Sequence, residues 1–238
     1  MSPRIVSLVP SLTEAVAASA PGLLVGATDW CTHPADLGVV RVKGTKNPDV
    51  PGILALGPDL VLANEEENRP ADLDELRAAG LDVLVTHIRS LPQALTELER
   101  VLVDACGLRR PPWLDEAGRV WTDPPALAPC RAVIPIWRRP WMVLGRETFA
   151  GDLLARLGIR NVYADHAERY PRIALEERPA ADLVVLPDEP YRFTAEDGPE
   201  AFAPLPAALV DGRSLTWYGP SLVDAPARLS AALRAAVR

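Results

Sequence analysis

The sequence predicts an α/β fold made of two similar lobes. Apolar segments alternate with helical segments along both halves of the chain, at the spacing typical of α/β proteins. The clearest stretch, Leu56–Val85, combines an apolar strand, a polar loop, a helix that opens at Pro70 and a second apolar strand. One helix between two strands implies a parallel pair with a right-handed crossover. The second half echoes this stretch, because AADLVVLPDE at 180–189 resembles GPDLVLANEE at 57–66. We therefore expect two Rossmann-like lobes with a ligand cleft between them.

Each element is predicted from a local signal. Short apolar runs indicate buried strands at 5–9, 23–27, 39–42, 60–63, 82–86, 132–136, 161–163, 183–186 and 207–210. Helices are expected at 11–20, 50–56, 70–80, 90–107, 113–121, 149–157, 173–177 and 222–237. Ser11 and Glu14 form a capping-box pattern at the start of the first helix. The Pro-rich region 108–130 predicts a helical linker between an N-terminal lobe, 1–107, and a C-terminal lobe, 131–238.

Composition limits the class of protein. The 238 residues are 48% hydrophobic and 24% charged, which predicts a packed globular core. A net charge of −7 without a Lys/Arg run argues against a nucleic-acid partner. We also expect the protein to be a monomer. No apolar run approaches the length of a membrane span. The first strand directly follows Met-Ser-Pro, without an export-signal pattern. We therefore expect a cytoplasmic protein, with a periplasmic or cell-surface location as the alternative.

Candidate ligand contacts gather in the loops that follow strands, where ligands meet parallel sheets. Seven aromatic residues lie in or beside such loops, namely Trp30, Trp137, Trp141, Tyr170, Tyr191, Trp217 and Tyr218. Glu66 and Asn68 follow the strand at 60–63, and Arg146 can receive a carboxylate or phosphate. Aromatic faces with a few polar groups suit a wide, flat, partly apolar ligand. Two alternatives stay open: tryptophans that pack in the core, and an acidic loop that is merely solvated.

Several segments resemble the periplasmic binding proteins with a helical backbone (class III), and most of all their cobalamin-binding members. They are RIVSLVPSLTEAVAA, GATDWCTHP, GTKNPDV, PWMVLGRETF and YPRIALEE. The resemblance implies two α/β lobes, a rigid linking helix, and one corrinoid or related metal chelate bound between the lobes. Haem and siderophore receptors belong to the same class. Members of this family usually deliver the ligand to an ABC importer in the membrane.

The resemblance also implies roles for individual residues. Trp30 and Tyr170 occupy positions of aromatic ligand contacts, and Trp141 lies near a third. Glu176 falls on a carboxylate that family members use to dock on the importer. The paired carboxylate of the first lobe is not matched, because Pro51 lies at or beside its place, with Asp49 nearby. The resemblance therefore predicts weakened docking on an importer.

Other classes of function are weighed against a binding protein. The sequence contains no G-x-S-x-G, P-loop or G-x-G-x-x-G motif, so we expect no catalytic residues, no intrinsic cofactor and no enzyme. Asp29, Cys31 and His33 have no common zinc spacing, and no metal site is predicted. The alternatives are a metal-chelate or tetrapyrrole-processing enzyme and a cytoplasmic ligand sensor. Cobalamin, another corrinoid, haem and a siderophore all remain open as ligands.

Overall fold

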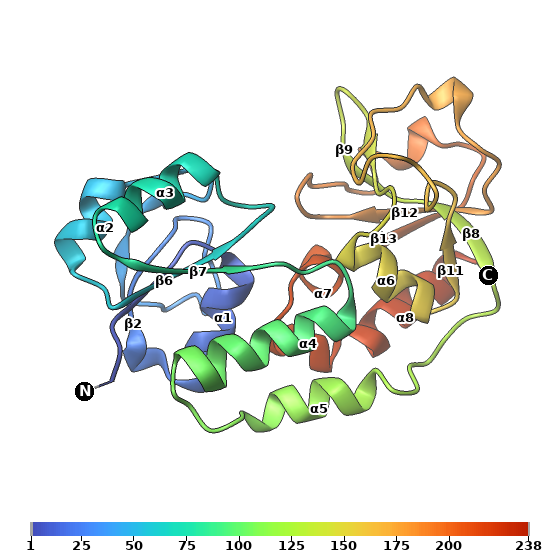
Figure 1. Ribbon diagram of the computed structural model, residues 1–238. Helices are drawn as coiled ribbons and strands as arrows, with labels where there is room; N and C mark the ends of the chain where they lie inside the picture. The colour runs from blue at the N-terminus through green and yellow to red at the C-terminus, as the bar shows by residue number, and fades with distance from the viewer. Residues whose placement is uncertain (1, 238) are drawn as a thin grey trace. The chain divides into compact units, whose positions relative to one another are not determined.

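Apolar segments of the first half pair into one parallel sheet in the computed structural model, which describes residues 2–237 (Figure 1). The strand order is β3-β2-β1-β6-β7. The strands are β1 (Ile5–Ser7), β2 (Leu24–Ala27), β3 (Val40–Arg41), β6 (Leu60–Asn64) and β7 (Asp82–Thr86). A small antiparallel hairpin, β4 (Lys43–Gly44) with β5 (Asn47–Pro48), follows β3. All five residues of β6 are buried, as expected of a central parallel strand covered on both faces.

Helices cover both faces of this sheet. On one face, α2 (Val50–Leu56) and α3 (Pro70–Ala78) contribute buried aliphatic residues to the core. On the other face, α1 (Pro10–Ser19) packs against β1 and β2, as Figure 1 shows. Because the strands are parallel, all their carboxyl ends lie at one edge of the sheet, and the loops at that edge carry Trp30 and Glu66.

A second parallel sheet forms in the other half of the chain, in the order β11-β8-β12-β13. Its strands are β8 (Cys130–Val133), β11 (Ile159–Asn161), β12 (Leu183–Pro187) and β13 (Ala207–Val210). Three helices accompany it, namely α6 (Phe149–Arg156), α7 (Gly212–Thr216) and α8 (Ala225–Ala236). Helix α6 packs against β11, α8 packs against β13, and α7 contacts both helices. A short antiparallel hairpin, β9 (Pro135–Trp137) with β10 (Met142–Val143), follows β8.

The chain divides into two units, each built around one sheet. Unit 1 comprises the residues up to Ile88, Gln93–Glu116 and Tyr218–Pro220; unit 2 comprises Arg89–Pro92, Ala117–Trp217 and the residues from Ser221 on. Helix α5 (Pro112–Val120) lies in the expected linker and crosses the division after Glu116. The expected ranges place residues 89–92 in the N-terminal lobe and residues 218–220 in the C-terminal lobe. In the structure, 89–92 belongs to unit 2 and 218–220 belongs to unit 1. Lobes defined as continuous residue ranges miss such segments, because a short segment can pack into the core of a unit that is otherwise distant from it in sequence.

Three helix predictions need correction. The helix expected at 173–177 does not form, and only a 3₁₀ turn, Leu175–Glu177, is present there. Ser11 is not the N-cap of α1, because the helix begins one residue earlier at Pro10 and Ser11 is buried in the first turn. Proline at the first helical position has a fixed φ suited to a helix, which explains the earlier start. The long helix expected at 90–107 is divided into α4 (Leu91–Glu99) and a π-helical segment, Arg100–Ala105. The α/β class itself is confirmed.

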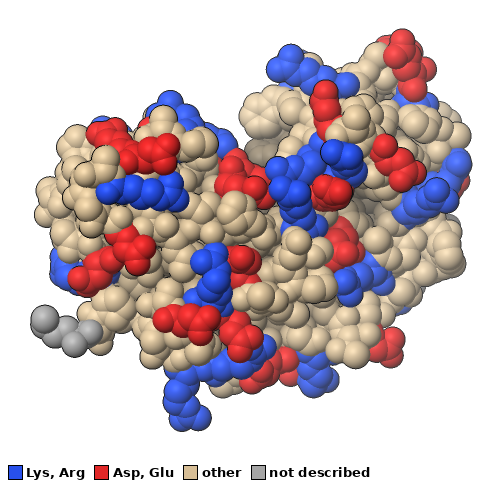
Figure 2. Space-filling view, viewed as in Figure 1, with Lys and Arg blue, Asp and Glu red and all other residues tan. Residues whose placement is uncertain are grey.

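Charged side chains of both signs are interspersed on the face that Figure 2 displays, with no broad field of either sign there. This mixture agrees with the modest net charge of −7. Among residues 2–237, none of the helices combines the length and the apolar character that crossing a membrane requires.

Candidate functional site

Trp30 is the most exposed large apolar side chain at the carboxyl edge of the unit 1 sheet, with 66% of its surface accessible. It lies in the loop 28–39 between β2 and β3. The backbone around it is ordered by hydrogen bonds from Cys31 N to Thr28 O (3.1 Å) and from Asp29 N to Lys43 O (2.8 Å). The indole therefore projects from a well-anchored loop.

The loop after β6 carries Glu66 and Asn68, and the two residues differ in their surroundings. Glu66 is half-buried, and its backbone N–H donates to Asn64 Oδ1 at 2.8 Å. Asn68 is buried, accepts a hydrogen bond from Asn64 N (2.9 Å) and donates to Thr45 O (3.0 Å) and Leu8 O (3.4 Å). Asn68 thus braces the loop from beneath, and Glu66 lies nearer the surface.

Further polar contacts extend along the same edge. His87, which follows β7, lies with its Nδ1 3.0 Å from Glu65 Oε2. The hydroxyl of Tyr218 donates to Glu67 Oε1 at 3.3 Å. Burial raises the pKa of Tyr218 well above its ordinary value, and the Glu67 carboxylate raises that pKa further. Tyr218 was among the aromatic residues expected in or beside loops, but it is buried, and its sequence position far from β6 gives no signal that it packs here.

Aromatic residues of unit 2 form one cluster around the β9–β10 hairpin. Trp137 is 43% exposed and meets Tyr191 edge to face, with 5.6 Å between the ring centroids. Trp141 stacks on Phe193 at 6.0 Å and meets Phe202 edge to face at 5.1 Å. Trp141 is therefore part of the core of unit 2, whereas Trp137 presents a face to solvent.

Arg138 ties this cluster to the loop 188–205. Its guanidinium pairs with Asp197 and with Glu200 (2.6 Å) and lies 5.1 Å above the Trp141 ring. The Tyr191 hydroxyl donates to the other oxygen of Asp197 at 2.6 Å. That hydrogen bond, then the charge of Arg138, lowers the pKa of Asp197. The pKa of Glu200 is lowered by the Gly198 N–H and by Arg138.

Three more predicted residues lie in unit 2. Arg146 is exposed and makes no ion pair within residues 2–237. Tyr170 is half-buried in a loop held against Gly145, whose N–H donates to Arg169 O at 2.7 Å. Trp217 is only 7% exposed, and its Nε1 donates to Glu189 Oε2 at 2.8 Å. Trp217 is thus a packed residue, while Arg146 and Tyr170 are accessible.

The suggested metal-ligand trio does not assemble. Cys31 is fully buried and contacts Thr13 Oγ1 (3.0 Å) and Thr28 Oγ1 (3.2 Å). Burial raises the pKa of the Cys31 thiol, which disfavours the thiolate that a metal requires. Across residues 2–237, the structure brings no three His, Cys, Asp or Glu side chains together in a way that could hold a metal ion.

The two residues considered for docking lie in different settings. Glu176 is exposed in a short 3₁₀ turn, Leu175–Glu177, of unit 2. Asp49 precedes α2 in unit 1, and its Oδ1 lies 3.5 Å from Lys43 Nζ. Pro51 is exposed in the first turn of α2. Both docking candidates are thus accessible, Glu176 in unit 2 and Asp49 in unit 1.

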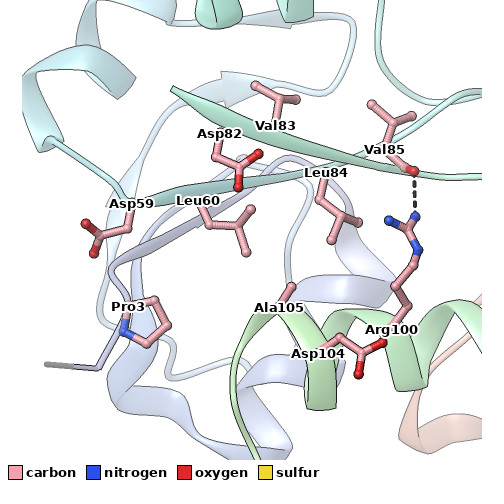
Figure 3. A pocket seen from close by; sticks show the side chains of 10 residues that line it. All are labelled: Pro3, Asp59, Leu60, Asp82, Val83, Leu84, Val85, Arg100, Asp104 and Ala105. Carbon is pink, nitrogen blue, oxygen red and sulfur yellow. Dashed lines mark hydrogen bonds between the residues drawn. The ribbon is translucent and has the colours of Figure 1, made fainter. Parts of the chain in front are cut away.

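A cavity of about 550 Å³ opens elsewhere in unit 1, beside the edge strand β7 and the π-helical segment (Figure 3). Leu84, Asp82 and Asp104 are among the residues that line it. Arg100 Nη2 donates to Val85 O at 2.8 Å across one end. None of the residues predicted from the sequence lines this cavity, so it is separate from the carboxyl-edge site.

Named relatives resemble much of the chain in sequence, although no protein-family model matches it. The vitamin B12-binding protein of Vibrio cholerae is 25% identical over 188 residues, which cover 73% of this chain and 66% of the relative. The vitamin B12-binding protein of Pectobacterium atrosepticum is 23% identical over 192 residues, which cover 73% and 67%. The chain thus spans about two thirds of the length of these relatives.

Solved structures resemble the whole chain in fold. A periplasmic haem-binding protein from Pseudomonas aeruginosa has a TM-score of 0.76 and 26% identity, covering 100% of this chain and 95% of the other. The periplasmic vitamin B12-binding protein of Vibrio cholerae has a TM-score of 0.72 and 19% identity, covering 99% and 98%. The class that the fold defines is that of the two-lobed periplasmic binding proteins.

More particularly, these neighbours are haem- and B12-binding members of the helical-backbone family, so the resemblance seen in the sequence is confirmed. The relatives and neighbours described above are all named as binding proteins. The expectation of a cytoplasmic location is wrong, because the solved structures that share this fold are periplasmic proteins. That expectation depended on the residues at the start of the sequence, which do not outweigh a likeness over the whole chain.

Proposed function

We propose that this chain is a substrate-binding protein for a corrinoid such as cobalamin. Trp30 carries the proposal, because a large aromatic face that is 66% exposed on an anchored loop is typical of a ligand contact. The relatives named vitamin B12-binding proteins support the choice of ligand. The predicted absence of catalysis is part of the proposal, and no residue is given a catalytic role.

The accessible residues of each carboxyl edge are proposed as the ligand contacts. In unit 1 they are Trp30 and Glu66. In unit 2 they are Trp137, Arg146 and Tyr170, with Tyr191 supporting the Trp137 ring. Aromatic faces suit the flat macrocycle, and Glu66 and Arg146 suit its amide or acidic edges. The buried residues Asn68 and Trp217, and Trp141, which packs against the core of unit 2, are proposed to act indirectly, by holding loops and neighbouring rings in place.

Haem is the second candidate ligand, and one observation favours it. Structures named haem-binding proteins share the fold, including one at 26% identity. Tyr170 is accessible, and a tyrosine oxygen is an established kind of haem-iron ligand. Absorbance distinguishes the two ligands, since a phenolate-ligated haem and a bound corrinoid have different visible bands.

We propose an ABC importer as the protein partner, with Glu176 as the main docking residue. Glu176 is exposed and has no ion-pair partner within residues 2–237, so it can meet a cation on another protein. The Asp49 carboxylate is the candidate in unit 1, but it is already paired with Lys43. Docking through Asp49 therefore requires the exchange of one ion pair for another, which weakens its contribution.

The test is a fluorescence titration of the wild type and two variants with cyanocobalamin. We expect Trp30→Ala to weaken binding by about 1–3 kcal/mol through lost aromatic contact. Leu54→Ala is the matched control, because Leu54 is also an exposed apolar residue of unit 1 but lies on α2. Equal affinities for all three proteins would remove Trp30 from the site.

A further inference from the structure

Arg41, the last residue of β3, makes an unusual set of contacts. Its Nη1 donates to Thr28 O and to Cys31 O, both at 2.9 Å, and its Nη2 donates to Leu37 O at 3.4 Å. All three acceptors are backbone carbonyls of the loop 28–39. Within residues 2–237, Arg41 forms no ion pair with a carboxylate. Its guanidinium is committed to this one loop.

Two of the three carbonyls flank Trp30 in the chain. Thr28 O and Cys31 O lie on either side of the exposed residue, and one nitrogen of Arg41 joins them. Thr28 O also accepts the N–H of Cys31, which closes the turn that contains Trp30. The guanidinium thus fixes the separation of the two ends of the segment that carries the indole.

The buried side of the same turn is anchored independently. Cys31 Sγ accepts a hydrogen bond from Thr13 Oγ1 at 3.0 Å and lies 3.2 Å from Thr28 Oγ1. These contacts hold the turn against α1 but do not reach its outer side. Arg41 is exposed and supplies the hydrogen bonds from the β3 side.

The Trp30 ring also lies against a glycine. A Cβ at Gly44 would stand 3.5 Å from Trp30 Nε1 and only 2.4 Å from Asn47 Oδ1, so the hairpin β4–β5 approaches the ring closely without a side chain there. The ring thus has a neighbour on one side and solvent on the other. An ordered backbone beneath an exposed ring lowers the entropy that ligand binding must remove.

We propose that Arg41 is the positioning residue for Trp30: it holds the loop 28–39 so that the indole is presented in one orientation to the ligand. The proposal rests on the proposed function only in making Trp30 a ligand contact. Its structural part, the ordering of Trp30, holds in the ligand-free protein and can be measured there. The planar fork of arginine matters, because one rigid group reaches three carbonyls.

The experiment compares Arg41→Met and Arg41→Lys with the control Arg77→Met. Arg77 is also an arginine of unit 1, but it pairs with Asp74 on α3. Each protein is also made with the additional substitution Trp30→Phe. Subtracting the emission of the Trp30→Phe form from that of its parent leaves the emission of Trp30 without that of the other five tryptophans. The readouts are the anisotropy decay and acrylamide quenching of Trp30 without ligand, and the dissociation constant for cyanocobalamin.

We expect faster local motion and stronger quenching of Trp30 in Arg41→Met, a smaller effect in Arg41→Lys, and no effect in Arg77→Met. We expect the affinity of Arg41→Met for cyanocobalamin to fall about tenfold. Guanidinium ion at low millimolar concentration should partly restore the order of Trp30 in Arg41→Met, which a general loss of stability would not allow. Unchanged Trp30 motion in both Arg41 variants would overturn the proposal. Loosened Trp30 with no cyanocobalamin binding even by the wild type would support the role of Arg41 and contradict the proposed function.

Discussion

At the scale of single residues, the surroundings of each tryptophan decide what it does. Trp30 is 66% exposed, whereas Trp217 is 7% exposed and hydrogen-bonds Glu189. We expect Trp217→Ala to lower the free energy of unfolding by ~3–5 kcal/mol, the usual cost of removing a buried aromatic ring. Trp30→Ala should change it by less than about 0.5 kcal/mol. Denaturant unfolding measures both, and equal losses would show that Trp30 is a core residue.

The sequence could predict that these aromatic residues lie near strand ends, but not which of them are buried. Trp141 packs against Phe193 and Phe202, and Trp217 bonds Glu189; all these partners are far away in the chain. Local patterns carry no information about such contacts. Arg41 was missed for the same reason, because its acceptors are backbone carbonyls, which any sequence supplies.

The three cysteines give a second residue-scale prediction. Cys31, Cys106 and Cys130 are all buried and free, and burial raises the pKa of each thiol, to about 11 for Cys106. Because the thiolate is the reactive form, we expect almost no reaction of the native protein with a disulfide reagent at pH 8. Three thiols should react after unfolding in denaturant. Rapid labelling of the native protein would contradict the burial of these side chains.

At the scale of elements, the Arg138 cluster makes the β9–β10 hairpin sensitive to acid. The pKa values of Asp197 and Glu200 are lowered in the folded protein, so their contribution to stability is complete above the ordinary carboxyl pKa of about 4. It is lost as the pH falls through the lowered values. We expect Trp137 emission to change in that acidic range, and Arg138→Met to show the acid-like emission already at neutral pH. An unchanged Trp137 signal in Arg138→Met would contradict this account.

Prediction from the sequence succeeded best where an element has a local cause. Pro70 opens α3, as the sequence indicated, and Gly57 follows α2 in a left-handed conformation. The strand Asp82–Thr86 was predicted with its observed bounds. The π-helical segment Arg100–Ala105 was not foreseen, because its apolar spacing continues that of α4. The apolar spacing predicts that the segment is helical, but it does not determine whether its backbone hydrogen bonds are those of an α-helix or of a π-helix.

At the scale of the whole molecule, the interleaving of the two units could not be read from the chain. Tyr218–Pro220 belongs to unit 1, where the Tyr218 hydroxyl donates to Glu67, although both its neighbouring segments belong to unit 2. Linear signals such as proline-rich regions indicate where a chain can change unit. They do not indicate where a later segment returns.

The proposed partner gives a prediction at the same scale. In vesicles with a corrinoid importer, we expect Glu176→Gln to reduce the transport stimulated by this protein by about one decade or more, because a charge-assisted contact is worth about 1.5–3 kcal/mol. Asp49→Asn should have a smaller effect, since Asp49 is paired with Lys43. Glu177→Gln is the control for net charge in the same turn. A larger loss with Asp49→Asn than with Glu176→Gln would reverse the assignment.

Calorimetric titration measures directly whether this chain binds a corrinoid. The purified protein is titrated in parallel with cyanocobalamin, cobinamide and haemin. We expect saturable heat with cyanocobalamin or cobinamide at one ligand per chain, accompanied by quenching of tryptophan emission. Binding of haemin, without binding of cyanocobalamin or cobinamide, would favour haem as the ligand, which is the second candidate function. No heat and no quenching with any of the three would contradict the claim.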